Sequence, residues 1–247
     1  MGEINKISKR GSEIMIKDKQ LIIDLDSTIV NSSLTIINLH NKLNPNNQYN
    51  YTDNIDWKFR PLVKSDEELS DLFKLFDHED FYKDVIVFPN AIEIINELAE
   101  NNSVYIVSKH MESRKRLSRE WINKVMPKVE IVFVDNFEDK GKLFDKVDYV
   151  IDDKWESFEN FSEDATCILF GLYDWNKDCI DYHRCMNWNE VENFIEYRER
   201  FIEYRNYYNK NPSQFIEDYL GTSIKLKWYQ KFFINHMNKI SFRIGRR

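Results

Sequence analysis

The stretch Leu21–Val30, LIIDLDSTIV, decides the fold of this 247-residue chain. Its first residues, Leu21–Ile23, form an apolar run that is too short for a helix, which is typical of a buried strand. Asp24 and Asp26 follow as this strand ends. Because alternate side chains of a strand point to the same face, both carboxylates can reach one crevice beyond it.

Four further apolar runs of the same kind lie downstream, and amphipathic stretches separate them. This alternation predicts right-handed crossovers and a parallel sheet covered by helices on both faces, which is a Rossmann-like α/β fold. The expected strands cover residues 104–107, 131–134, 149–151 and 167–170, and the expected helices cover residues 90–101, 111–125 and 188–208.

Polar side chains follow most of these strands. Ser108 follows the second strand and Asp152 the fourth, as Asp24 follows the first. In doubly wound sheets the binding crevice lies beyond the carboxyl ends of the strands. The combination therefore indicates one site, although each residue alone is also typical of a turn or a helix N-cap.

The segment between the first two strands is longer than a crossover needs, since about 80 residues separate Asp26 from Ser108. It has helical patterns near residues 32–43 and 66–77, and we expect a helical cap that can act as a lid. The expected segments are an N-terminal extension 1–18, a core of 19–31 and 88–187, the inserted cap 32–87, a C-terminal helix 188–209 and a basic appendage 210–247.

The pair Asp24 and Asp26 suggests phosphoryl-transfer chemistry. Two adjacent carboxylates resist joint ionisation unless a cation neutralises them, and an all-oxygen site suits Mg²⁺. One carboxylate can attack phosphorus and form an aspartyl-phosphate, and the other can protonate the leaving oxygen and then activate water. A turn or capping role is the alternative for both residues.

Two further residues can hold a phosphate. Ser108 can donate a hydrogen bond to a phosphate oxygen, and a helix N-cap is its alternative role. Lys142, ten residues before Asp152, can neutralise phosphoryl charge, and a solvated surface position is its alternative. Lys140 competes with Lys142, because one residue of helix phasing decides between them.

These motifs resemble the four motifs of the haloacid dehalogenase-like (HAD) phosphohydrolases. The resemblance spans residues 20–185 and rests on Leu21–Val30, Ser108 after VYIV, Lys142 and Asp152-Asp153. The stretches FPNAIEIINELAENNSVYIVS and YVIDDKWESFENF resemble one branch more closely, the 5′(3′)-deoxyribonucleotidases. Members of that branch carry a helical cap between the first two motifs.

The resemblance implies a Mg²⁺-dependent phosphomonoesterase. It makes Asp24 the nucleophile and a Mg²⁺ ligand, and it makes Asp26 the acid/base and a Mg²⁺ ligand through its carbonyl. The other implied residues are the metal ligand Asp152, its support Asp153 and the phosphate-binding pair Ser108 and Lys142.

The resemblance also implies an aromatic residue of the cap that stacks on the base of a nucleotide. Phe81 and Tyr82 are the candidates, and packing in the cap core is their alternative role. Trp57 is a further candidate by position and chemistry. Lys109 is expected to contact the substrate. His110 is expected at the surface, with a substrate contact as the alternative.

Composition excludes several classes of protein. Hydrophobic residues make up 42% of the chain and charged residues 31%, which is typical of a globular protein. Three cysteines are too few for a disulfide framework, so a reducing cytoplasm is expected. No apolar run approaches the roughly 18 residues of a membrane-spanning helix, and residues 1–19 lack the apolar core of a signal peptide.

Charge is unevenly spread. Residues 210–247 carry eight Lys/Arg and two acidic residues, although the whole chain has a net charge of −7. This asymmetry indicates a separate segment that can contact nucleic acid or a protein partner, or a tail that packs on the body. Around Trp228-Tyr229-Gln230, residues 212–247 also resemble the opening of the large terminase subunit of tailed phages, which implies a phage or prophage source. No phosphate-binding loop of the G-x-x-x-x-G-K-[ST] type is present, so we expect no ATPase activity in this chain.

The expected function is hydrolysis of a phosphomonoester, with a nucleoside monophosphate as the substrate. A phosphatase acting on nucleic-acid ends is the enzymatic alternative, since a basic tail can hold a strand. A packaging-associated binding protein without turnover is the alternative outside enzymes.

Overall fold

The computed structural model describes residues 16–50, 59–219 and 225–244. Within these ranges, Ile16–Asn193 form one compact unit, and the residues from Phe194 onward belong to a second. The first unit holds a sheet with its crossover helices and the helical insertion. None of the helices in the described ranges is long and apolar enough to cross a membrane.

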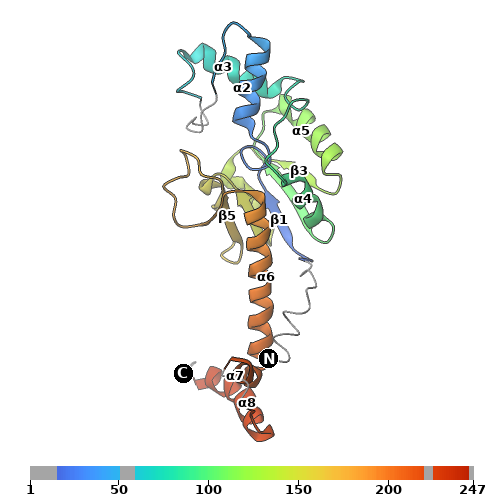
Figure 1. Cartoon of the computed structure of the whole chain (residues 1–247), viewed down its shortest axis with the longest axis vertical. Coiled ribbons are helices and arrows are strands. Elements are labelled where there is room, and N and C mark those ends of the chain that lie inside the picture. Colours follow the sequence, from blue (N-terminus) through green and yellow to red (C-terminus); the bar gives the residue numbers. More distant parts are fainter. Residues whose placement is uncertain (1–15, 51–58, 220–224, 245–247) are drawn as a thin grey trace. The chain divides into compact units, whose positions relative to one another are not determined.

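A six-stranded sheet forms the centre of the first unit, in the order β3-β2-β1-β4-β5-β6 (Figure 1). Every neighbouring pair is parallel, which confirms the α/β fold with a Rossmann-like sheet. The strands are β1 (Gln20–Ile23), β2 (Ser103–Ser108), β3 (Glu130–Phe133), β4 (Tyr149–Asp152), β5 (Thr166–Phe170) and β6 (His183–Cys185).

The sequence analysis did not predict β6. This strand pairs with β5 at the edge of the sheet, where Ile168 stands beside His183. Its three residues are His, Arg and Cys, and only Cys185 is buried. So short a polar segment gives no apolar periodicity from which a strand could be predicted.

Strand β1 lies between β2 and β4 and carries the decisive motif out of the sheet. Leu21, Ile22 and Ile23 are at most 1% exposed, because both faces of this strand are covered. Beyond the strand, the Asp24 amide still donates to the Ile151 carbonyl at 2.9 Å. This bond holds Asp24 beside the end of β4.

Helices and short 3-10 turns follow the strands. The predicted helices appear as α4 (Ala91–Ala99), α5 (Glu112–Val125) and α6 (Trp188–Lys210), with ends shifted by two residues at most. The 3-10 turns η2 (Phe137–Lys142) and η3 (Trp155–Phe158) come after β3 and β4. All these connections leave the strands at their carboxyl ends, where the site forms.

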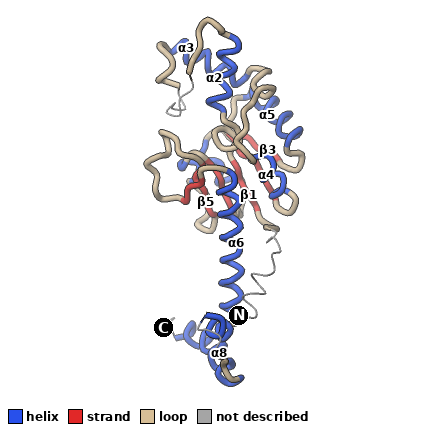
Figure 2. Tube along the Cα trace, viewed as in Figure 1, coloured by secondary structure: helices blue, strands red, loops and turns tan. Residues whose placement is uncertain are grey.

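The insertion contains α2 (Ser32–Leu43), α3 (Asp66–Lys74) and the 3-10 turn η1 (Leu75–Asp77), close to the two helices predicted there (Figure 2). Side chains of Asn31 and Ser65 cap the first turns of α2 and α3. The insertion buries a cluster of its own, made of Ile36, Ile37, Leu39, Phe59, Leu72 and Phe81. It is therefore a small helical layer with its own core.

The second unit contains the last part of α6, α7 (Pro212–Tyr219) and α8 (Trp228–Ile244). Asn235 accepts from the Ser213 amide at 3.0 Å, and Lys231 donates to Glu217 at 2.7 Å, so α7 and α8 pack together. At the start of α8, Trp228 and Phe233 are 80% and 63% exposed. The partner role expected for residues 210–247, their resemblance to the terminase and the segment boundaries stay predictions.

Candidate active site

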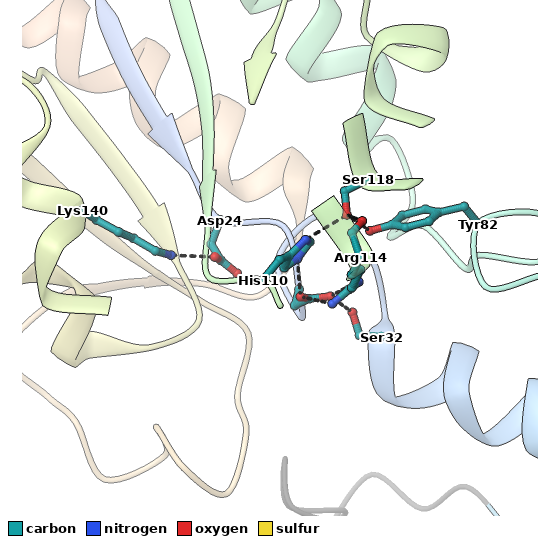
Figure 3. A network of polar contacts seen from close by, with 8 residues as sticks. Asp24, Ser32, Tyr82, His110, Arg114, Ser118 and Lys140 are labelled. Carbon is teal, nitrogen blue, oxygen red and sulfur yellow. Dashed lines mark hydrogen bonds and ion pairs between the residues drawn. The ribbon is translucent and has the colours of Figure 1, made fainter. Parts of the chain in front are cut away.

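Three buried carboxylates gather where β1 and β4 end. One oxygen each of Asp24, Asp152 and Asp153 lies within 4.8 Å of the others. Lys140 is 1% exposed and donates to Asp24 Oδ1 at 2.6 Å (Figure 3). It also donates to Asp152 Oδ2 at 2.7 Å. The site is therefore a group of three acids, and one lysine bridges two of them, Asp24 and Asp152.

The structure corrects the predicted lysine. Lys142 points to solvent, where it pairs with Asp139 at 2.8 Å, and Lys140 occupies the position expected for Lys142. The reason is local geometry, because these residues lie in a 3-10 turn rather than in the helix that the phasing assumed. Gly141 fixes the turn, since a Cβ there would lie only 2.4 Å from the carbonyl carbon of Asn160.

The electrostatics of the cluster favour a cation. The pKa of Asp24 is raised to about 7, because burial and the nearby Asp152 and Asp26 carboxylates together outweigh the lowering effect of Lys140. Burial and the charges of Asp152 and Asp24 also raise the pKa of Asp153 well above its ordinary value. Crowded carboxylate oxygens with such pKa values fit Mg²⁺, which prefers oxygen ligands.

Asp26 points to different partners. Arg114 donates from both terminal nitrogens to the two Asp26 oxygens, at 2.8 Å each, and His110 Nε2 lies 3.0 Å from Oδ2. Ser32 at the start of α2 donates to the same carboxylate (Figure 3). Burial acts to raise the pKa of Asp26, but the charge of Arg114 and the bond to His110 outweigh it and hold this pKa well below its usual range.

His110 is buried and not at the surface, which corrects the expectation for this residue. Its Nδ1 lies 2.8 Å from Ser118 Oγ, and Ser118 in turn contacts the Tyr82 hydroxyl at 2.7 Å. Because a carboxylate only accepts hydrogen bonds, His110 Nε2 carries the proton in its contact with Asp26. A chain of polar contacts thus runs from Asp26 to the cap (Figure 3).

The structure also corrects the stacking residues. Phe81 is fully buried in the cap cluster, and Tyr82 packs on Trp121 with ring centroids 5.5 Å apart. Neither residue lines the cavity described below. Their rings instead face the guanidinium of Arg114, at 4.8 and 5.7 Å. Trp57 lies outside the described residues.

A cavity of about 410 Å³ lies between the strand ends and the cap. Five of the residues predicted from sequence line this cavity from the core: Asp24, Asp26, Ser108, Lys109 and Asp152. The side chain of Ser108 is buried, and Lys109 Nζ lies 5.1 Å from the ring centroid of Phe137. Lys142, Phe81 and Tyr82 are absent from its lining.

The cap contributes aromatic residues that sequence reasoning missed. Phe59, Phe73 and Phe76 line the cavity, and Asp77 follows them on η1. The three-residue spacing of Phe73 and Phe76 puts both on one helical face, which was the signal that could have identified them. Phe59 gives no such signal, because it stands in irregular chain outside any helix.

A family model described as "5′ nucleotidase, deoxy (Pyrimidine), cytosolic type C protein" matches residues 18–201, about three quarters of the chain. The chain belongs to this family. It is therefore a HAD-like phosphohydrolase close to the deoxyribonucleotidases, and a hydrolase that acts on phosphoric monoesters. No curated protein matches the chain in sequence.

Solved structures of HAD proteins are similar to this family member at low identity. A HAD-superfamily hydrolase of subfamily IA from Geobacter sulfurreducens is 11% identical, with a TM-score of 0.49 over 72% of this chain and 96% of that one. A haloacid dehalogenase-like family hydrolase from Streptococcus pneumoniae is 15% identical, with a TM-score of 0.45 over 73% and 98%. YfnB from Bacillus subtilis, described as bound to magnesium, is 13% identical, with a TM-score of 0.45 over 72% and 98%.

Proposed function

We propose that this nucleotidase hydrolyses nucleoside monophosphates in a Mg²⁺-dependent reaction that passes through an aspartyl-phosphate on Asp24. The observation that carries the proposal is the placement of Asp24. Its carboxylate lies among two other buried acids and a buried lysine, and Asp26 and Ser108 line the same cavity. This set provides a nucleophile, a proton-transfer group and phosphate contacts in one enclosed space.

Asp24, Asp152 and Asp153 are the carboxylates that would hold Mg²⁺, and the Asp26 carbonyl is a further candidate ligand. The bound ion would neutralise the charge that develops on the phosphoryl oxygens. Lys140 donates a hydrogen bond to Asp24 and another to Asp152 and offsets part of their negative charge. It is thus the cation of this chain that would share that charge, and Ser108 would donate to a phosphate oxygen.

The chemistry divides between two carboxylates. An oxygen of Asp24 attacks phosphorus, a new O–P bond forms, and the bond from phosphorus to the nucleoside oxygen breaks. Asp26 gives its proton to the departing oxygen and then takes a proton from the water that hydrolyses the aspartyl-phosphate. Arg114 and His110 favour the ionised form of Asp26, which suits the second step. The negative charge of an incoming phosphate raises the pKa of Asp26 and so favours the protonated form for the first step.

The test is phosphate release from a panel of mononucleotides, sugar phosphates and 5′-phosphorylated oligonucleotides, with Mg²⁺ or with a chelator. We expect Mg²⁺-dependent release from mononucleotides that Asp24→Asn reduces at least about a thousandfold. Lys142→Met serves as the matched control, because Lys142 forms an exposed ion pair with Asp139 and does not line the cavity. Unchanged release by Asp24→Asn would exclude Asp24 as the nucleophile.

A phosphorylated nucleic-acid end is the second candidate substrate. The basic, aromatic α8 favours it, since Trp228 and Phe232 are exposed and lysines at 225 and 227 precede them. Activity on an oligonucleotide held by such a surface would fall steeply with salt, whereas activity on a mononucleotide would not. A salt titration of both activities separates the two substrates.

A further inference from the structure

The side chain of Asp77 has a carboxylate oxygen that lacks a hydrogen-bond partner in the described part of the chain, and Asp77 is one of the residues that line the active-site cavity. Oδ1 of Asp77 is buried and has no hydrogen-bond partner among the described residues. Asp77 lines the cavity from the cap, where Phe59, Phe73 and Phe76 line it too. An unpaired buried acceptor is costly, so a site that keeps one indicates a donor that arrives with the ligand.

The position of Asp77 fits the base of a nucleotide, and this step rests on the proposed function. The phosphate end of the substrate belongs beside Asp24 and Ser108, which line the cavity from the core. The opposite end, the base, then reaches the cap wall. Three phenylalanine rings there offer flat apolar faces, and the Asp77 oxygen offers an acceptor at the edge of a base lying against them.

The chemistry of the base edges decides which pyrimidine a carboxylate accepts. Cytosine presents an amino group at N4 that can donate to an aspartate. At the same position of the ring, C4, uracil and thymine present a carbonyl oxygen, and a carboxylate placed to accept from the cytosine amino group would face this oxygen instead. A buried acceptor that meets an acceptor loses its hydrogen bond and gains a repulsion.

We propose that Asp77 accepts a hydrogen bond from the exocyclic amino group of the base and so selects cytosine nucleotides over uracil and thymine nucleotides. Asp77 is then a specificity residue of the cap wall. It takes no part in the phosphoryl transfer, which occurs at the core wall.

Glu156 offers a matched control. Its Oε2 is also buried without a partner, and it lines the same cavity. It lies on η3, however, just after Asp152 and Asp153, and therefore on the core wall. Glu156→Gln removes the same charge as Asp77→Asn from the wall that faces the phosphate end.

The experiment compares dCMP with dUMP, which differ at the base only in the N4 amino group and its neighbouring nitrogen. Binding of both is measured by calorimetry to Asp24→Asn protein, which retains the cavity, and kcat/KM is measured on the enzyme with an intact Asp24. We expect dCMP to be favoured at least about tenfold in both measurements. Asp77→Asn should bring the ratio close to one, because an amide can either accept from cytosine or donate to uracil.

Glu156→Gln should keep the dCMP preference even if it changes both affinities. Equal affinity and equal kcat/KM for dCMP and dUMP with Asp77 intact would overturn the proposal. An unchanged preference for dCMP in Asp77→Asn would overturn it too. Collapse of the ratio in Glu156→Gln alone would move the selecting group to the core wall and also overturn it. Asp77→Ser gives a second variant with the same expected loss of preference.

The experiment distinguishes failure of the proposed reaction from failure of the proposed base selection. If the enzyme releases no phosphate but binds dCMP in preference to dUMP through Asp77, the proposed reaction is wrong and the base selection stands. If phosphate is released equally from dCMP and dUMP, the reaction stands and the base selection is wrong.

Discussion

Arg114 forms a bidentate ion pair with Asp26, in which its two terminal nitrogens each donate to one carboxylate oxygen at 2.8 Å. The Cζ atom of the same guanidinium lies over two aromatic rings, 4.6 Å from the ring centroid of Phe76 and 4.8 Å from that of Phe81. Arg114 comes from α5 of the core, and both rings belong to the cap. One buried side chain thus contacts both Asp26, the proposed proton-transfer group, and the cap.

This arrangement predicts a kinetic role for Arg114. Arg114→Lys keeps the charge but loses the two parallel hydrogen bonds, since an ammonium is a point donor. We expect kcat to fall about tenfold or more while KM changes much less. The reason is that the substitution disturbs the orientation of Asp26 and leaves the contacts of the substrate in place. Arg114→Met should lower kcat further. Steady-state kinetics on a mononucleotide separates the two parameters.

Arg116→Met is the matched control for this series. Arg116 lies on the same helix in an exposed pair with Glu120, at 2.8 Å. We expect its removal to change kcat less than about twofold and stability by no more than about 0.5 kcal/mol. A fall in kcat as large as that of Arg114→Lys would show that any disturbance of α5 lowers the rate, and that the hydrogen bonds from Arg114 to Asp26 are not the cause.

The two lysines of η2 give a second prediction, on stability. Lys140→Met leaves the buried Asp24 and Asp152 without their shared cation, which should cost roughly 3 kcal/mol in the metal-free protein. Lys142→Met removes an exposed pair with Asp139 and should leave the free energy of unfolding nearly unchanged. Urea unfolding in the presence of a chelator measures both. Equal effects of the two substitutions would contradict the bridging role of Lys140.

Metal binding should depend on pH through Asp24. Because burial raises the pKa of Asp24 to about 7, this residue is largely protonated at pH 5.5, and protons compete with Mg²⁺ for it. We expect the affinity for Mg²⁺ to rise by up to about tenfold per pH unit below pH 7 and to level off above it. Calorimetric titrations between pH 5.5 and 8 check this, and a flat profile would contradict it. Asp152→Asn should weaken binding at every pH.

The same pKa shift affects the stability of the metal-free protein. Asp24 has an ordinary pKa of 3.8 and a folded-state pKa of about 7, so the folded state binds the proton more tightly. Its contribution to stability is therefore complete below about pH 4 and is lost as the pH rises to 7. Asp26, whose pKa is lowered, contributes in the opposite sense and loses its contribution as the pH falls below its ordinary pKa of 3.8. Unfolding free energies with a chelator at pH 5 and 7.5 should show a lower stability at pH 7.5, and Asp24→Asn should reduce this difference.

Much of the fold was predictable because short apolar runs are typical of buried parallel strands. Asp24, Ser108 and Asp152 were found for the same reason, since each directly follows such a run. Residues in the turns and the cap were harder to predict. The choice of Lys140 over Lys142 depended on a 3-10 turn, which has a different residue period from an α-helix.

Long-range partners left no local signal at all. Arg114 meets Asp26 across 88 positions of sequence, and nothing around Arg114 marks it as more than one of several basic residues on an amphipathic helix. His110 looked like a surface residue because it stands in a polar loop, whereas tertiary contacts with Asp26 and Ser118 bury it. Phe81 and Tyr82 were candidates by residue type, and the packing of the cap directed their rings toward Arg114 instead of the cavity.

The last prediction concerns Gly141, which connects backbone packing to the site. A Cβ at this position would lie 2.4 to 2.7 Å from backbone atoms of Asn160 and Phe161, so the segment cannot accept one without moving. Since Gly141 adjoins Lys140, we expect Gly141→Ala to shift the lysine away from Asp24 and Asp152. Phosphate release should fall about tenfold or more, and stability by about 1–3 kcal/mol. Lys142→Met, two residues from Lys140, controls for disturbance of the same turn and should retain activity. If Gly141→Ala is as active and as stable as the unsubstituted enzyme, the turn is not held by this close approach, and the position of Lys140 has another cause.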